Sequence, residues 1–307
     1  MQTFLPYRSF ERSARALDSR RLGKQRVEAL QVLRALEIED YGWRHHPVVH
    51  MWRGYTEALV CYACAIVAEW TRRGFRDACR DAILEFAPHV RSQRELSLAG
   101  ALPPWLGWRA LHRSHRSALV RKDPEHYRPL FPDVPPDLPY VWPEPAGPPP
   151  PPEPFSAWAL RAPSAETVER CRAEGVARLL RIERGAPPGS KRARQVGAFL
   201  SEARAGDPIV LVLGRELLAG VIAGPPRTRR HDHVRSVRWL EPIARSELRA
   251  PARLQDPRLF FALRGEDELR AWIGEAAARG AAGAGRPPAA RARRRPSRSP
   301  GRRSPRR

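Results

Sequence analysis

Proline is concentrated in one stretch of this chain, and that stretch limits how the rest can fold. Residues 132–154 contain twelve prolines and end in GPPPPPEP. Proline has no backbone N–H and its ring clashes with a preceding helical turn, so neither a helix nor a central strand can form there. A proline run adopts polyproline II, which advances about 3.1 Å per residue. The sequence therefore predicts a stiff linker at 132–154 between domains at 1–131 and 155–277.

The residues before the prolines have the pattern of an all-α domain. Residues 17–36, LDSRRLGKQRVEALQVLRAL, place leucine and alanine on one helical face and charged or amide side chains on the other. Pro47 disfavours helix at His46 and favours a helix start at its own position. One long core helix is therefore predicted over 48–73, with Gly74 as its stop. Shorter helices are predicted near 76–86 and 108–121.

The residues after the prolines predict an α+β domain. Strand patterns occur at 155–161, 176–182, 207–213, 217–224, 233–241 and 260–263, and helix patterns at 164–175 and 192–206. Short connections between the later strands favour mostly antiparallel pairing in a small barrel. Residues 278–307 are rich in Arg, Pro, Ala, Ser and Gly, which predicts a disordered basic tail.

The net charge of +22 points to a polyanionic partner, most simply nucleic acid. Arginine supplies 52 of the 55 basic residues, a bias that a GC-rich genome also produces. The N-terminus lacks the order of a signal peptide and the longest apolar run, 58–68, is too short to span a bilayer. A cytoplasmic protein without a membrane partner is expected. Cys61 and Cys64 lie in an apolar helix without a second pair, so no metal site or other cofactor is expected.

One carboxylate, Glu28, lies on the basic face of the 17–36 helix. Lys24 is one turn before it and Arg21 two turns before it, which makes this face suitable for phosphate. The alternative is an ordinary surface pair of Lys24 with Glu28, worth a few tenths of a kcal/mol. A second basic cluster lies at 113–122, with His112 and His115 beside it. These histidines are interpreted as surface or phosphate-contacting residues, because the spacing places no third metal ligand.

Four segments carry a family resemblance: the helix with Glu28, the HHP turn at 45–47, the helix ending in AEWTRRGF and the closing RKDPEHY. Through these segments, residues 1–131 resemble the pyrimidine dimer DNA glycosylase family. The resemblance implies a helical domain that removes an ultraviolet photoproduct base and cleaves the abasic strand. In that family an N-terminal amine attacks the sugar and one helix glutamate supports the Schiff-base chemistry. Glu28 takes the glutamate position, and His45 or His46 takes that of a substrate-side histidine.

Position 2 departs from this family, which carries a small residue there that is exposed by removal of the initiator methionine. Gln2 disfavours that removal because of its bulk. Three alternatives remain: the amine of Met1 attacks, Lys24 replaces it, or lyase activity is absent. The expected DNA contacts are basic side chains of the two clusters and the turn, namely Arg20, Arg21, Arg26, Arg44, His45, His46, Arg113, His115, Arg116, Arg121 and Lys122.

The second half has a likeness of its own. Residues 206–225 followed by 231–241 resemble PUA-like and EVE-like modules, which implies an aromatic pocket for a modified base. Trp158 and Trp239 are the candidate stacking residues, and core packing is the alternative role for both. The preferred hypothesis is a glycosylase that acts on damaged or modified bases in double-stranded DNA by base flipping. Its rivals are a non-catalytic reader of modified nucleic acid and an RNA-processing factor.

Overall fold

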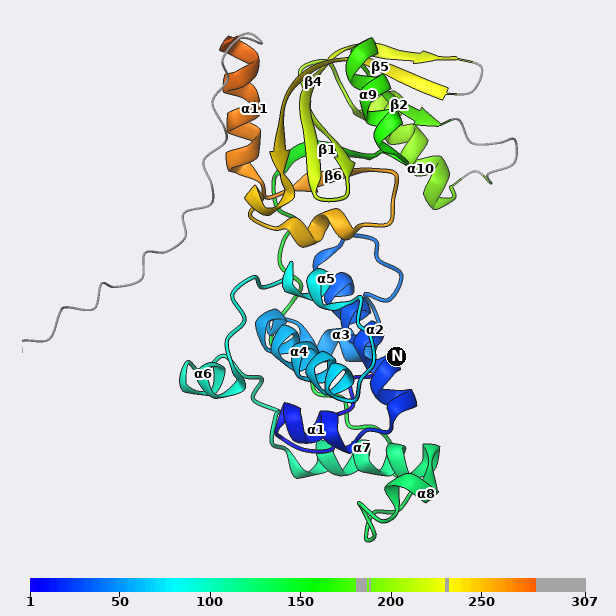
Figure 1. The fold of residues 1–307 in the computed structure, drawn as a ribbon, viewed down its shortest axis with the longest axis vertical. Helices are drawn as coiled ribbons and strands as arrows, with labels where there is room; N and C mark the ends of the chain where they lie inside the picture. Colours follow the sequence, from blue (N-terminus) through cyan, green and yellow to red (C-terminus); the bar gives the residue numbers. More distant parts are fainter. Residues whose placement is uncertain (181–186, 188, 230–231, 280–307) are drawn as a thin grey trace, which may run out of the picture. The chain divides into compact units, whose positions relative to one another are not determined.

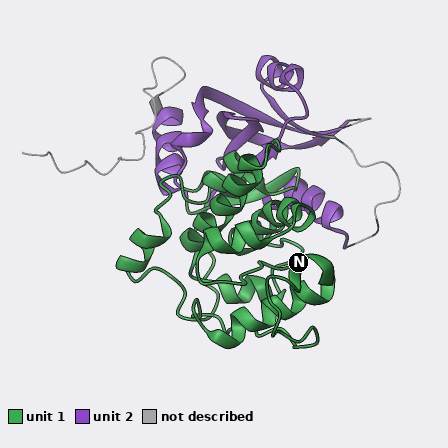
Figure 2. Cartoon of the chain, turned by 60° about the horizontal axis from the view of Figure 1, so that its bottom comes forward, with its two compact units in different colours: residues 1–155, 250–265 green, residues 156–249, 266–307 purple. Residues whose placement is uncertain are grey.

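The computed structural model describes residues 1–180, 187, 189–229 and 232–279 (Figure 1). By its internal contacts the chain divides into two units (Figure 2). Unit 1 comprises 1–155 with 250–265, and unit 2 comprises 156–249 with the described residues from 266 onward. The predicted basic tail lies, from residue 280, outside the described residues.

Unit 1 is helical before the prolines, as predicted. Its helices are α1 (Phe10–Ala16), α2 (Ser19–Glu37), α3 (Pro47–Trp52), α4 (Thr56–Arg72), α5 (Arg80–Leu84), α6 (Gln93–Leu98), α7 (Arg109–Lys122) and α8 (Pro124–Tyr127). The predicted first long helix is α2, and Asp18 caps it by accepting a hydrogen bond from the backbone N–H of Arg21. Helix α4 packs against α1 and α2 and buries Leu59, Tyr62 and Ile66 completely.

The single helix predicted over 48–73 is wrong, because the structure breaks it into α3 and α4. Gly54 lies between them with φ +85°, a left-handed conformation that a right-handed helix cannot include and that favours glycine. The predicted stop is confirmed: α4 ends at Arg72, and Gly74 follows with φ +86°.

The predicted linker is not confirmed, since residues 132–154 belong to unit 1. Two serines of α7 bind this stretch: Ser117 Oγ accepts from the N–H of Leu138 at 3.0 Å, and Ser114 Oγ accepts from the N–H of Val141 at 3.2 Å. An extended segment cannot satisfy its own N–H groups, so side-chain acceptors hold it in place.

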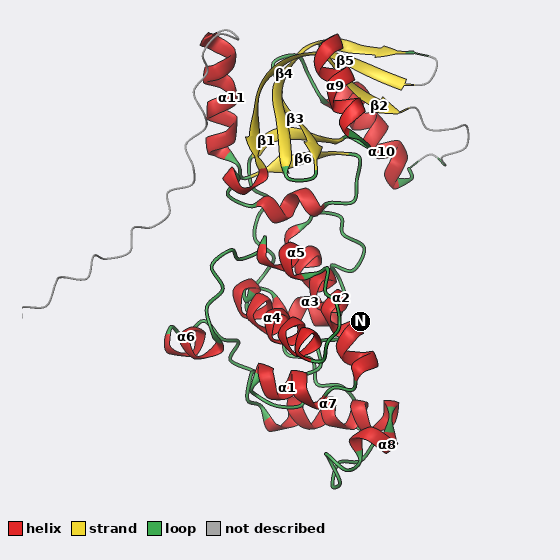
Figure 3. Ribbon diagram, in the orientation of Figure 1, coloured by secondary structure: helices red, strands yellow, loops and turns green. Residues whose placement is uncertain are grey.

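The sheet has six strands in the order β2-β5-β4-β3-β1-β6 and curls into a half-barrel (Figure 3). Strand β1 pairs in parallel with β3, while β2 with β5, β3 with β4, and β4 with β5 are antiparallel. The bounds are β1 (Phe155–Arg161), β2 (Val176–Leu180), β3 (Pro208–Leu213), β4 (Glu216–Thr228), β5 (Asp232–Ala244) and β6 (Phe260–Arg264). The predicted strands are therefore present, but a PUA-like assignment is not confirmed.

The helices that accompany the strands are α9 (Ala165–Glu174), α10 (Lys191–Gly197) and α11 (Asp267–Arg279). A π-helical turn, η1 (Ala198–Glu202), extends α10, and 3-10 turns η2 (Arg245–Glu247) and η3 (Pro251–Gln255) precede β6. Helix α11 was not predicted from the sequence. Within the described residues, no helix combines the length and apolar character needed to cross a membrane.

Candidate active site at the N-terminus

The first residues of the chain lie buried inside unit 1. Thr3 and Leu5 are completely buried, and Gln2 and Phe4 nearly so. On the side of α2, the Gln25 amide accepts from the N–H of Phe4 at 3.0 Å and donates to the carbonyl of Gln2 at 2.5 Å. One glutamine side chain therefore fixes the register of this segment against α2.

Two aromatic residues hold the same segment from α3 and α4. The indole N–H of Trp52 donates to the hydroxyl of Thr3 at 2.9 Å, and the hydroxyl of Tyr62 donates to the carbonyl of Phe4 at 2.9 Å. Burial raises the pKa of Tyr62 well above its usual value, so this hydroxyl remains a donor. The break at Gly54 matters here, because it separates the helices that carry these two donors.

The third side of the segment is held by the histidines of α7. The N–H of Leu5 donates to Nδ1 of His115 at 2.8 Å, and Nδ1 of His112 lies 2.8 Å from the carbonyl of Leu5. These partners assign the proton to Nε2 of His115 and to Nδ1 of His112. Burial lowers the pKa of His115 to about 3 and also lowers the pKa of His112. Both rings are therefore neutral at pH 7.

This geometry corrects two predicted DNA contacts. His115 is completely buried, so its prediction as a phosphate contact is wrong. Arg116 donates from Nε to the carbonyl of Pro6 at 2.7 Å, and its guanidinium lies over the rings of Tyr7 and Phe131. Both residues position the N-terminal segment, and the long separation along the chain hid this role from the sequence.

Glu28 lies next to the N-terminus. Its Oε2 accepts a hydrogen bond from the backbone N–H of Gln2 at 3.1 Å, and its Oε1 lies 3.7 Å from Nζ of Lys24. The Glu28 side chain is 14% exposed and that of Lys24 is 75% exposed. The carboxylate is thus mostly enclosed, unlike that of an ordinary surface pair, and it lies one residue from the α-amine of Met1.

His46 joins this group from the start of α3. As the N-cap residue it accepts a hydrogen bond from the N–H of Val48 on Nδ1 at 3.2 Å, which assigns the proton to Nε2. Burial lowers the pKa of His46, the positive N-terminal amine lowers it further, and Glu28 opposes this shift. The structure therefore brings Met1, Lys24, Glu28 and His46 together around one carboxylate.

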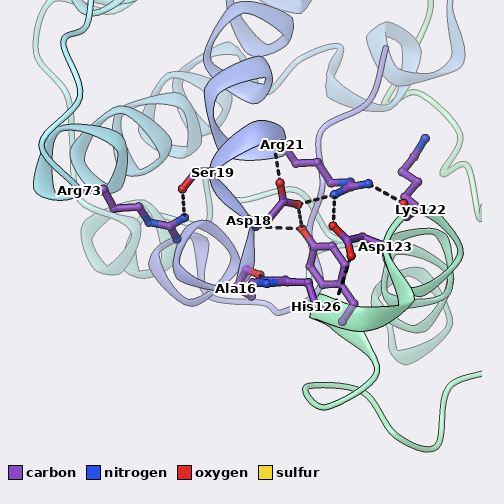
Figure 4. A network of polar contacts seen from close by, with 9 residues as sticks. Ala16, Asp18, Ser19, Arg21, Arg73, Lys122, Asp123 and His126 are labelled. Carbon is purple, nitrogen blue, oxygen red and sulfur yellow. Dashed lines mark hydrogen bonds and ion pairs between the residues drawn. The ribbon is translucent and has the colours of Figure 1, made fainter.

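Two of the predicted phosphate-binding arginines are already paired. Arg21 donates to Asp18 at 2.6 Å, to Asp123 at 3.1 Å and to the carbonyl of Lys122 at 2.8 Å (Figure 4). Burial acts to raise the pKa of Asp18, but hydrogen bonds from Tyr127 and Arg21 outweigh it and the pKa is lowered. The prediction of Arg21 as a phosphate contact is wrong for this geometry, since the guanidinium joins α2 to the end of α7.

Arg26 has a similar structural role. It pairs with Asp77, and its guanidinium lies 4.4 Å from the ring centre of Trp70. Its prediction as a phosphate contact is corrected for the same reason. Of the other predicted contacts, Arg20, His45, Arg113, Arg121 and Lys122 are exposed and Arg44 is half-buried. Arg121 also donates to the carbonyl of Pro136 at 2.9 Å.

The two tryptophans predicted to stack a modified base are structural residues of unit 2. Trp158 is 7% exposed and its indole N–H donates to Asp207 at 3.0 Å. The indole N–H of Trp239 donates to the carbonyl of Cys171 at 2.9 Å, and its ring packs so closely on Gly220 that a Cβ there would lie 2.7 Å from it. These contacts agree with the alternative role of both residues in packing, and Trp158 is too deeply buried to offer its face to a base.

Sequence reasoning missed the residues that anchor the N-terminal segment, Gln25 above all. A signal for it was present, because Gln25 lies between Leu22 and Ala29 on the apolar face of α2. An amide on a buried face requires partners, which predicts a polar contact. Among the described residues, no group of three or more histidines, cysteines or carboxylates is placed to hold a metal ion.

A family model described as pyrimidine dimer DNA glycosylase matches residues 1–82. No curated protein and no solved structure matches the chain significantly. The matched residues include Met1, Lys24, Glu28 and His46, so the comparison supports the family resemblance of the N-terminal sequence at the candidate site.

Proposed function

We propose that this protein is a DNA glycosylase that removes pyrimidine dimers, or a related damaged base, through the site formed by the N-terminus and Glu28. The observation that carries the proposal is the 3.1 Å hydrogen bond from the N–H of Gln2 to Glu28, which places a carboxylate beside the start of the chain. The family match to residues 1–82 supports the same chemistry. Double-stranded DNA is the proposed substrate, in keeping with the net charge of +22.

The proposed reaction needs an unprotonated amine and a group that moves protons. The amine attacks C1′ of the damaged nucleotide, the bond from C1′ to the base breaks, and the base takes the bonding electrons and a proton from water. The attached amine loses one proton, O4′ of the sugar takes up a proton as the ring opens, and an iminium ion forms at C1′. Glu28 is placed to accept the proton from the amine and to stabilise the positive charge at the sugar. In the lyase step the iminium ion loses a proton from C2′, a double bond forms between C2′ and C3′, and the phosphate on C3′ leaves with the electrons of its bond.

The identity of the amine is part of the proposal. The α-amine of Met1 is one residue from Glu28, and Nζ of Lys24 is 3.7 Å from the carboxylate. With Met1 attached, the nitrogen of Gln2 is an amide nitrogen and cannot attack. Removal of Met1 turns that nitrogen into an amine that already lies 3.1 Å from Glu28. The mass of the mature N-terminus decides whether the α-amine belongs to Met1 or to Gln2, and Nζ of Lys24 is present in either case.

Borohydride trapping tests the reaction. The protein is incubated with an ultraviolet-irradiated duplex and sodium borohydride, which reduces an iminium ion to a stable adduct. We expect an adduct with wild-type protein and a large loss with Glu28→Gln. Glu37→Gln, at the other end of α2, is the matched control and retains the adduct. Mass spectrometry of the trapped peptide identifies the amine.

Two outcomes contradict the proposal. Absence of both the adduct and alkali-labile abasic sites on the irradiated duplex with wild-type protein argues against a glycosylase. Equal adduct yields in the wild type and Glu28→Gln remove the role of Glu28.

A non-catalytic reader is the second candidate, favoured by Gln2, whose bulk opposes exposure of an amine at position 2. It predicts lesion-dependent binding that Glu28→Gln leaves unchanged.

A further inference from the structure

A row of aromatic rings borders the candidate active site. The rings of Trp43 and His46 meet edge to face with their centres 6.0 Å apart, and His46 meets Trp142 in the same way at 6.0 Å. Trp142 then contacts Tyr140 at 5.3 Å. Trp43 comes from the turn before α3, whereas Tyr140 and Trp142 come from the proline-rich stretch.

The row leads from the surface to the catalytic group. Its outer member, Trp43, is 49% exposed, whereas Trp142 and Tyr140 are half-buried. Its inner end lies near the N-terminal segment, because the ring of Tyr140 meets that of His115 edge to face at 5.8 Å, and His115 accepts the hydrogen bond from the N–H of Leu5. His46 in the middle is the ring whose pKa responds to the N-terminal amine and to Glu28.

Polar groups suited to a base edge accompany the rings. Nε2 of His46 carries a proton, since Nδ1 is used by the helix cap. Nε2 of His50 is buried and has no hydrogen-bond partner within the part of the chain that the structure describes. His50 lies one helical turn after His46 in α3, where its backbone N–H donates to the carbonyl of His46 at 3.3 Å. Buried ring nitrogens rarely remain without a partner, and an incoming ligand can supply one.

We propose that Trp43, His46 and Trp142 form a subsite that stacks a nucleobase displaced from the DNA duplex. An aromatic face binds any base, and the exposed half of Trp43 offers such a face beside the site of chemistry. This inference rests on the proposed function, and it adds the stretch predicted as a linker to the site. Trp158 and Trp239 do not serve this purpose, because their indoles are held within unit 2.

The test measures binding and needs no turnover. A fluorescein-labelled duplex with one unpaired adenine is compared with the fully paired duplex at fixed moderate salt, because low salt enhances non-specific binding. Stacking of one base is worth about 1–3 kcal/mol, so Trp43→Ala is expected to weaken binding of the bulged duplex by about 5- to 150-fold. Binding of the paired duplex should change little, and Trp43→Phe should restore most of the loss.

Trp108→Ala is the matched control, since Trp108 is also 49% exposed and, among the described residues, makes no ring contact with His46. It should bind both duplexes like wild type. Equal losses on both duplexes in Trp43→Ala would mean a general DNA contact and overturn the proposal. Unchanged binding of the bulged duplex would overturn it too.

The same binding assay determines which base enters the subsite. One duplex carries tetrahydrofuran, an abasic analogue, opposite adenine, and a second carries it in both strands. If the effect of Trp43→Ala requires the adenine, the subsite takes the base opposite the lesion; if it persists, the subsite takes a base that flanks the lesion. No effect on either duplex contradicts the subsite. Because catalysis is not measured, this result is independent of whether borohydride traps an adduct.

Discussion

Replacing Gln25 by alanine should both destabilise the protein and displace its N-terminus. The Gln25 amide is the partner of two buried backbone groups, the N–H of Phe4 and the carbonyl of Gln2. A buried polar group left without a partner costs about 1–3 kcal/mol, so Gln25→Ala should lower the free energy of unfolding by about 2–6 kcal/mol. Urea unfolding followed by tryptophan fluorescence measures this change.

The same substitution should affect the reaction more than its effect on folding explains. The carbonyl of Gln2 belongs to the residue whose N–H bonds Glu28, so losing the Gln25 contact frees the start of the chain from the carboxylate. Under conditions where the variant remains folded, the yield of borohydride-trapped adduct should fall.

Gln31→Ala is the control for this prediction, because Gln31 is a half-buried glutamine of the same helix. It should change the free energy of unfolding by less than about 0.5 kcal/mol, since surface substitutions rarely do more and alanine favours helix. If Gln25→Ala and Gln31→Ala have the same effect on stability, the N-terminal segment is not held by Gln25 and the reasoning fails.

Three further predictions concern stability. Hydrogen bonds from Arg72 lower the pKa of Glu69 to about 2 from an ordinary 4.5. The stabilising contribution of Glu69 is therefore complete above pH 4.5 and lost as the pH falls towards 2. Over that range, the difference in unfolding free energy between wild type and Glu69→Gln should shrink. His115 remains neutral down to a pKa of about 3, whereas the unfolded ring protonates near 6.5, so between these values it should cost about 1.4 kcal/mol of stability per pH unit of acidification. His115→Asn, which keeps an acceptor but does not titrate, should lack this slope in urea titrations at pH 6 and pH 5. Gly54→Ala forces a side chain into φ +85° and should cost about 1–2 kcal/mol, while Gly42→Ala, where a Cβ meets nothing within 4 Å, should be nearly neutral by thermal unfolding.

The elements of this fold were largely readable from local sequence. Apolar periodicity located α2 and α7, and alternation located the strands, because each pattern reports which face of one element is buried. The left-handed turn at Gly54 was not readable, since a glycine inside an apolar pattern is also compatible with a continuous helix. The pattern gave the length of the helical region but not its break.

The candidate site shows the same division. The sequence by itself placed Glu28 one turn from Lys24 on the basic face of α2 and indicated the turn that carries His46. Tertiary structure alone decided which of the predicted DNA contacts are free: Arg21 is paired with Asp123, about a hundred residues away, and His115 is buried against Leu5. Burial and pairing depend on contacts between segments distant in the chain, and a local pattern contains no information about the partner.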